Sequence, residues 1–444
     1  MRKTLQPTLV FLLVVFFSAH FALAQTGGSK VTVNPDLVLE VNGRRVFPIG
    51  FTMPPKPDAK APSGKFGIEE LADAGATFMR TGPSQKVEWD DAYIAIEKQY
   101  QDAAAKYGMY CLPWLKELSA IDPKHPEKEQ QLRKIINLFK DHPGMGCWKG
   151  EDEPEWGNRP VEPMLKAYNV IRQLDPNHPV WIVEAPRGTI DTLRPYMPTR
   201  DITGIDIYPI SYPPGIHSLE PNKDLSMVGD YTRLMRAVVQ DKKPTWMTLQ
   251  IAWSGVVGEG RTLRMPSFPE ERFMAYEAII SGARGLVFFG GSLQQAMNDQ
   301  DKQLGWNWTF WNNVLRRLIL EIGDKSPLKP ALVAPESKLM EKMNAKYVGV
   351  QYTAADMIEF TVREDGTDLY LLACNRSRET FHITFENLPQ TEPTAEVMFE
   401  APRTVEAKWI SRDVEKPKKT TVQLGTLTDW FAPFEVHVYK LKRK

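Results

Sequence analysis

The chain has 444 residues, with 55 Lys and Arg against 55 Asp and Glu, so its formal net charge at pH 7 is zero. This balance gives no electrostatic reason to expect nucleic acid or an anionic membrane surface as a partner. With 42% hydrophobic and 25% charged residues, the composition is that of a globular protein long enough for more than one domain.

Residues 1–24 have the pattern of a secretory signal peptide. A basic start, MRKTLQP, precedes the apolar run TLVFLLVVFFSAHFALA, which ends in small residues before Gln25. No other apolar run is long enough to span a bilayer, so stable membrane insertion is not expected. The sequence therefore predicts a secreted or periplasmic protein whose mature chain begins near Gln25.

Short apolar runs alternate with segments of helical period up to about residue 325. Asn42-Gly43 lies between two apolar stretches and predicts a hairpin ahead of them. The apolar runs cover residues 46–52, 76–82, 108–115, 144–154, 179–186, 202–210, 244–253 and 285–291. Apolar strands separated by helices are typical of a parallel sheet covered on both faces, and eight of them fit a (β/α)₈ TIM barrel. An open doubly wound sheet would need a Gly-rich first turn, which IGFTMPPKP does not provide. The sequence predicts an α/β barrel domain over residues 25–325.

The pattern changes after the Pro-rich stretch DKSPLKPALVAPES. Apolar and polar residues then alternate, and Asp365-Gly366 indicates another hairpin. Residues 326–444 are therefore expected to form a small all-β sandwich domain. Its role is left open between bracing the barrel and binding polysaccharide.

Active sites of such barrels lie at the carboxyl ends of the strands, so polar and aromatic residues there are the candidates. The stretch GCWKGEDEPEWG follows the fourth strand and holds four acidic residues within five positions, which raise the pKa of one another. A solvated acidic loop at a helix start is the alternative interpretation, and it accounts for Glu155 without any function. Candidates at the other strand ends are Arg80, Trp114, Glu184, Asp206, Tyr208, Gln250, Trp253 and Trp306.

Carboxylates and aromatic rings at one barrel mouth suit a carbohydrate substrate. Hydrolysis of a glycosidic bond needs a protonated carboxyl group and a second group that stabilises or attacks the sugar centre. Crowded carboxylates separate their pKa values and so supply the protonated member. The seven His show no metal-ligand spacing, and Cys111, Cys147 and Cys374 are widely spaced. No metal or cofactor is predicted.

The sequence Asp152-Glu153-Pro154 after the fourth strand, with a closing β-domain that ends FEVHVYKL, resembles the clan A glycoside hydrolases. The bacterial β-galactosidase-like and endoglucanase-like members are the most similar. The resemblance implies that Glu153 is the catalytic acid/base. It also implies that Asp152 replaces the Asn that binds the sugar 2-hydroxyl in that clan.

The resemblance stops at the seventh strand, where clan A carries its nucleophilic Glu. Gln250 occupies that place, and no carboxylate follows before Glu259. In one interpretation Asp206, or failing that Glu184, is the second carboxylate. A carboxylate from another strand is compatible with an inverting enzyme, in which the carboxyl groups are roughly 6.5–9.5 Å apart. In another, Asp152 and Glu153 act as in substrate-assisted β-N-acetylhexosaminidases, where the acetamido group of the substrate is the nucleophile. In the third, the barrel binds carbohydrate without cleaving it.

Overall fold

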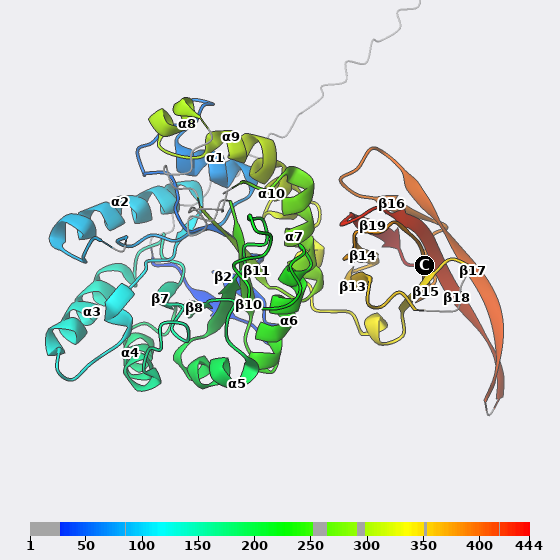
Figure 1. Cartoon of the computed structure of the whole chain (residues 1–444), viewed down its shortest axis with the longest axis horizontal. Coiled ribbons are helices and arrows are strands. Elements are labelled where there is room, and N and C mark those ends of the chain that lie inside the picture. The colour runs from blue at the N-terminus through cyan, green and yellow to red at the C-terminus, as the bar shows by residue number, and fades with distance from the viewer. Residues whose placement is uncertain (1–26, 85, 252–263, 291–297, 350–352, 417) are drawn as a thin grey trace, which may run out of the picture.

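The structure, a computed structural model, describes residues 27–84, 86–251, 264–290, 298–349, 353–416 and 418–444 (Figure 1). The predicted signal peptide and Trp253 lie outside the described residues. Within them, no helix combines the length and apolar character that crossing a membrane requires.

Eight parallel strands form a closed barrel (Figure 1). They are β4 (Ile49–Phe51), β5 (Phe78–Met79), β6 (Tyr110–Cys111), β7 (Trp148–Asp152), β8 (Val180–Glu184), β9 (Ile202–Asp206), β10 (Thr245–Gln250) and β11 (Gly285–Phe289). The sheet runs β6-β5-β4-β11-β10-β9-β8-β7, and parallel bridges from Cys111 to Met145 and from Trp114 to Lys149 join its two ends. Each strand lies within a predicted run, so the predicted barrel is confirmed.

Helices cover the outside of the barrel. They are α1 (Gly67–Ala74), α2 (Asp91–Tyr107), α3 (Pro126–Phe139), α4 (Val161–Leu174), α5 (Ile190–Leu193), α6 (Met227–Val239), α7 (Phe268–Ile280), α8 (Asp299–Leu304), α9 (Trp308–Phe310), α10 (Arg316–Ile322) and α11 (Lys329–Leu332). The described residues also form the short helical turns η1 (Lys116–Ser119), η2 (Arg194–Thr199), η5 (Trp311–Leu315) and η6 (Lys338–Glu341). Helix α2 illustrates how the sequence sets their limits. The Asp90 side chain accepts a hydrogen bond from the amide of Tyr93, and Gly108 ends the helix with a φ of 73°.

A small sheet closes the end of the barrel away from the strand carboxyl ends. It contains β1 (Val31–Val33), β2 (Leu39–Val41) and β3 (Arg44–Val46). The predicted hairpin joins β2 to β3 through Asn42 and Gly43, whose φ angles are 53° and 77°. The apolar side of this sheet packs with Trp181 and Trp246, which stand near the amino ends of their strands. The end of the barrel at the strand carboxyl ends, where the candidate site residues lie, is not covered by this sheet.

The C-terminal part is the predicted all-β domain, built as one continuous sheet whose two halves face each other. Its strands are β12 (Asn344–Tyr347), β13 (Ile358–Asp365), β14 (Asp368–Asn375), β15 (Phe381–Leu388), β16 (Thr394–Val397), β17 (Thr404–Lys416), β18 (Lys418–Phe431) and β19 (Val436–Lys442). The order is β12-β15-β18-β17-β16-β19-β14-β13. Phe385 of β15 packs against Phe360 of β13 and Tyr439 of β19, so the halves enclose a common core.

Helix α7 lies between the barrel and this sheet, and it is buried on nearly all sides (Figure 1). Arg376 connects the two parts, with its Nε 2.8 Å from Glu277 Oε1 on α7 and its Nη1 3.1 Å from Glu359 Oε1 on β13. Burial and the nearby Glu359 carboxylate raise the pKa of Glu277 to about 8. Packing of this extent favours a bracing role for the sheet.

The all-β domain contains a titratable cluster that makes its stability depend on pH. His437 is 3% exposed and lies between Glu400 (Nδ1 to Oε1, 2.5 Å) and Glu435 (Nε2 to Oε2, 3.4 Å). Burial lowers the pKa of His437, but these two carboxylates outweigh it and raise the pKa to about 9.

We predict that His437→Gln removes a pH-dependent part of the unfolding free energy. The folded pKa lies above the unfolded value of about 6.5, so the stabilisation is complete below that pH and is lost as the pH rises to about 9. Urea unfolding should show that the unfolding free energy of wild type falls by on the order of 3 kcal/mol between a pH below this window and a pH above it. The unfolding free energy of His437→Gln should fall by clearly less over the same change in pH. The exposed His125→Gln serves as control, and equal pH dependence in His437→Gln and wild type would contradict the assignment.

Candidate active site

The carboxyl ends of the barrel strands surround a cavity of about 480 Å³, here called the inner cavity. Asp152 and Glu153 reach it from the end of β7, and Asp206 reaches it from the end of β9. Three further predicted residues from other strand ends also line it: Arg80, Trp114 and Tyr208. The carboxyl ends of the strands meet at one end of the barrel, so residues up to 128 positions apart in the chain, from Arg80 to Tyr208, line the same cavity.

Glu153 and Asp206 form a close pair. A carboxylate oxygen of Glu153 lies within 4.8 Å of one of Asp206. Burial, with the charge of Asp152, raises the pKa of Glu153. Burial and the neighbouring Glu153 raise the pKa of Asp206 well above its ordinary value. Two carboxylates at this distance cannot both ionise easily, so the pair holds its last proton to a higher pH than an isolated carboxyl group would.

The spacing of this pair bears on one of the alternatives left open by the sequence. It is narrower than the roughly 6.5–9.5 Å of inverting glycosidases and nearer to the roughly 5–5.5 Å of retaining ones. This spacing therefore fits a retaining arrangement of Glu153 and Asp206 better than an inverting one.

Glu153 stands on a strained backbone. Its φ is 47°, in the left-handed region that a residue with a Cβ enters at a cost of about 1–3 kcal/mol. The amide of Glu153 donates to the carbonyl of Val183 at 2.9 Å, which fixes the turn against β8. Such strain persists where surrounding structure enforces it, and here it directs the Glu153 carboxyl group toward Asp206.

Asp152 has the opposite electrostatic environment. Lys149 Nζ lies 2.8 Å from Asp152 Oδ1, and the Lys149 side chain is almost fully buried. Burial alone would raise the pKa of Asp152, but Lys149 and Arg80 outweigh it and lower that pKa. Asp152 therefore ionises at lower pH than the neighbouring Glu153 and Asp206 pair, and this separation of pKa values is typical of acid/base sites.

Aromatic rings form one wall of the inner cavity. Tyr208 stacks on His217, with ring centroids 4.4 Å apart, and on Phe289 at 5.4 Å. Burial, with the charge of Arg187, lowers the pKa of His217 to about 3, so its imidazole is neutral near pH 7. On the other side the Arg80 guanidinium lies 4.8 Å from the Trp114 ring centroid.

One cluster in the site has the chemistry to bind a metal ion. Glu153, Asp206 and His217 each offer a ligand atom within 4.8 Å of the others, and His217 Nε2 is 3.9 Å from Asp206 Oδ2. One imidazole nitrogen with two carboxylate oxygens suits a divalent ion such as Zn²⁺. Local His spacing did not predict this cluster because its members come from β7, β9 and the loop after β9.

Three of the predicted substrate contacts, Glu184, Gln250 and Trp306, are buried side chains that line neither this cavity nor a second one beside it among the described residues. Glu184 is fully buried in an ion pair with Arg200 (Oε1 to Nη2, 2.7 Å). The Gln250 amide bonds to both the amide and the carbonyl of Ile210, at 2.7 and 2.8 Å. Trp306 is 1% exposed and donates its indole N–H to the Met53 carbonyl at 2.7 Å.

Sequence reasoning missed Lys149, His217 and Phe289. Lys149 was a lone cation within an apolar run, three positions before Asp152, which simple strand alternation places on the opposite face. The pairing of β7 with β8 shifts register between Lys149 and Asp152, and this irregularity brings the two side chains together. His217 lies in a loop with no periodic signal.

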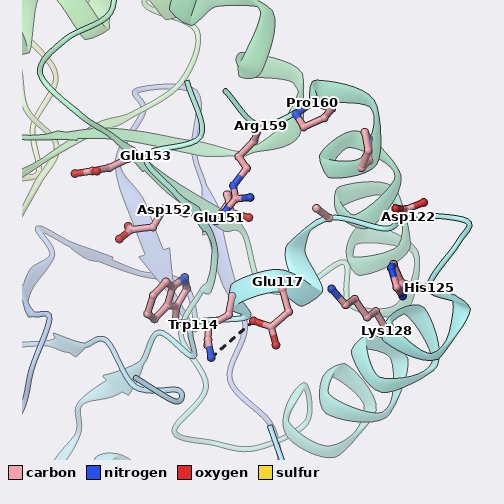
Figure 2. A pocket seen from close by; sticks show the side chains of 13 residues that line it. Trp114, Glu117, Asp122, His125, Lys128, Glu151, Asp152, Glu153, Arg159 and Pro160 are labelled. Carbon is pink, nitrogen blue, oxygen red and sulfur yellow. Dashed lines mark hydrogen bonds and ion pairs between the residues drawn. The ribbon is translucent and has the colours of Figure 1, made fainter. Parts of the chain in front are cut away.

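A second cavity of about 540 Å³, here called the outer cavity, adjoins the first (Figure 2). Trp114, Asp152 and Glu153 line both cavities. The rest of the outer cavity comes from the end of β7, from η1, and from the segments that lead into α3 and α4 together with the first turns of these helices. Glu153 therefore stands on the boundary between two spaces.

No family model and no curated protein matches the chain. Solved structures do match over nearly its whole length. One is a family 5 glycoside hydrolase from Bacteroides vulgatus, with 14% identity over 94% of this chain and 93% of that one and a TM-score of 0.57. A protein described only as a glycoside hydrolase has 13% identity, 94% and 97% coverage and a TM-score of 0.53. An α-amylase from Anoxybacillus has 11% identity, 89% and 98% coverage and a TM-score of 0.51. At these identities the likeness establishes the fold alone, a (β/α)₈ barrel followed by a C-terminal β-domain.

Proposed function

We propose that this protein is an exported glycoside hydrolase that cleaves O-glycosidic bonds, with Glu153 as general acid. Export rests on the signal-peptide pattern of residues 1–24. The observation that carries the catalytic proposal is the placement of the carboxyl pair. Glu153 lines both cavities, whereas among the described residues Asp206 lines the inner cavity alone. A sugar in the inner cavity would have Asp206 near its reacting carbon and Glu153 near the oxygen that leaves.

The proton retained by the pair supplies the acid. In the proposed step Glu153 gives a proton to the glycosidic oxygen, the bond from that oxygen to the sugar carbon breaks, and the leaving group departs as an alcohol. Both carboxyl groups are then ionised beside a sugar centre that carries positive charge, and Asp206 stabilises or attacks it. Water then bonds to the sugar carbon, and any bond from Asp206 to that carbon breaks. Glu153 accepts a proton from the water, which restores the starting protonation of the pair.

Asp152 is proposed to hold the sugar. Because Lys149 and Arg80 keep it ionised, it can accept a hydrogen bond from a sugar hydroxyl or from an acetamido N–H. The second possibility keeps the substrate-assisted route open, and N-acetylhexosamine glycosides in a substrate panel separate it from the two-carboxylate route.

We predict that Glu153→Gln lowers kcat by about 10²–10⁴-fold while the fold survives, because the amide cannot donate the acidic proton. The measurement is sugar release from a panel of aryl glycosides and oligosaccharides. Glu155→Gln is the matched control, since Glu155 belongs to the same acidic run and lines neither cavity among the described residues. Equal activity of Glu153→Gln and wild type would remove Glu153 from the mechanism.

A second prediction concerns the pH profile. The charge of Asp152 raises the pKa of both Glu153 and Asp206. Asp152→Asn removes that charge and leaves Lys149 and Arg80 unbalanced, so the pair should lose its proton at lower pH. The alkaline limb of kcat/KM should therefore move to lower pH in the variant. A limb that stays in place or moves to higher pH would show that the catalytic proton is not on this pair.

A metal-dependent hydrolase is a second candidate function, and the Glu153, Asp206 and His217 cluster is the observation that favours it. Dialysis against a chelator, followed by metal analysis and assay, separates the two. Activity lost on chelation and restored by Zn²⁺ would select the metal route, whereas unchanged activity would select the carboxylate route.

A further inference from the structure

A small cavity of about 90 Å³, here called the basal cavity, lies at the end of the barrel opposite the candidate active site. Thr245 at the start of β10 and Arg284 just before β11 line it, together with Arg236 near the end of α6. Its other charged lining residues are Asp241, Lys243 and Glu336. The space equals about three water molecules at about 30 Å³ each, so it has room for one small inorganic ion.

Positive charge exceeds negative charge around the basal cavity. Arg363 of β13 is 3% exposed and lies against Glu336, which brings the cations to four against two acids. Arg236 Nη1 and Arg363 Nη2 both face Glu336 Oε1 at 3.6 Å, which is too long for a hydrogen bond. Asp241 Oδ1 lies 2.7 Å from Arg236 Nε and neutralises that group alone. Burial, with the charge of Arg284, lowers the pKa of Arg363 to about 9.

Several polar groups at this place have no hydrogen-bond partner among the described residues. Thr245 lines the cavity and is 1% exposed, and its Oγ1 is one of them. Nη1 of Arg363 is another, and it is also buried. Arg284 donates from Nη1 to the Ala334 carbonyl at 2.9 Å, and no described residue accepts from its Nε or Nη2. Buried polar groups of folded proteins are almost always hydrogen-bonded, so these donors indicate a ligand that accepts.

The donors and the excess of positive charge together favour an anion. A guanidinium group presents a fork of N–H groups that matches the oxygens of phosphate or sulfate two at a time. Water alone would satisfy the donors but would leave the excess charge in place. A divalent cation would be repelled by the guanidinium groups, and an organic acid of several carbons exceeds a space of about three water molecules.

We propose that the basal cavity binds one inorganic oxyanion of the phosphate or sulfate class. The ion would neutralise guanidinium groups from α6, from the start of β11 and from β13, and so join the barrel to the all-β domain. This site is independent of the proposed function, because it uses neither Glu153 nor any other residue of the two cavities at the mouth. An ion that binds only the folded chain also stabilises it by mass action.

The test is equilibrium dialysis of the full chain against radiolabelled inorganic phosphate, at an ionic strength held constant with sodium chloride. Wild type should bind one phosphate per chain, and excess sulfate should displace it. Arg284→Gln should weaken binding by at least about tenfold, because it removes a charged donor. That variant also loses the bond to Ala334, so Thr245→Val, which removes only a hydroxyl without a partner, is the second variant and should weaken binding too. The exposed Arg133→Gln, outside the cavity, is the control.

A third variant tests the sign of the electrostatic argument. Glu336→Gln removes the carboxylate that competes with the anion for two guanidinium groups, so it should strengthen phosphate binding.

Three results would overturn the site. One is the absence of saturable phosphate binding to wild type in the presence of chloride. Another is binding that Arg284→Gln and Thr245→Val leave unchanged, which would place the ion elsewhere, for example beside Arg80 and Lys149 in the inner cavity. The third is weaker binding to Glu336→Gln, because a carboxylate cannot assist an anion that lies beside it.

Discussion

The constraint on which the site depends is the crowding of three carboxyl groups at the ends of two strands. Asp152, Glu153 and Asp206 are brought together by β7 and β9, where solvent cannot screen them fully. Lys149 forms an ion pair with only one of them, Asp152. Lys149 and Arg80 lower the pKa of Asp152, whereas the pKa values of Glu153 and Asp206 are raised. Because the cations lie nearer to Asp152 than to the other two carboxyl groups, chemically similar side chains have pKa values shifted in opposite directions.

The rest of the molecule is arranged to leave that end of the barrel accessible. The three-stranded sheet closes the opposite end, and the all-β domain packs against α6 and α7 on one side. Of the described residues, none from β12 to β19 lines either cavity. One end of the barrel is therefore closed by the three-stranded sheet, and one side packs against the all-β domain. The polar side chains of the inner cavity lie at the other end. Rigid support of this kind is what a strained residue such as Glu153 requires.

The sequence predicted the barrel well, because each strand is a short apolar run. Active sites of such barrels lie at the strand carboxyl ends whatever the sequence of the particular protein. The expectation that polar residues at strand ends face the barrel mouth agrees with the positions of Asp152, Glu153 and Asp206, which line the inner cavity. Glu184 and Gln250 lie elsewhere, because a polar residue at a strand end can bond to protein instead of facing the cavity, as the ion pair with Arg200 and the bonds to Ile210 show. Trp306 also lies outside both cavities, since its large apolar surface packs against Phe51. Lys149 and His217 depend on a register shift and on a loop conformation, neither of which appears in residue periodicity.

The most direct test of the account is the anomeric configuration of the sugar first released from a responding oligosaccharide, followed by proton NMR before mutarotation. A close Glu153 and Asp206 pair predicts that the product keeps the configuration of the substrate. Retention would support a reaction that passes between these two carboxyl groups. An inverted product would contradict it, because inversion needs room for a water molecule that this pair does not leave.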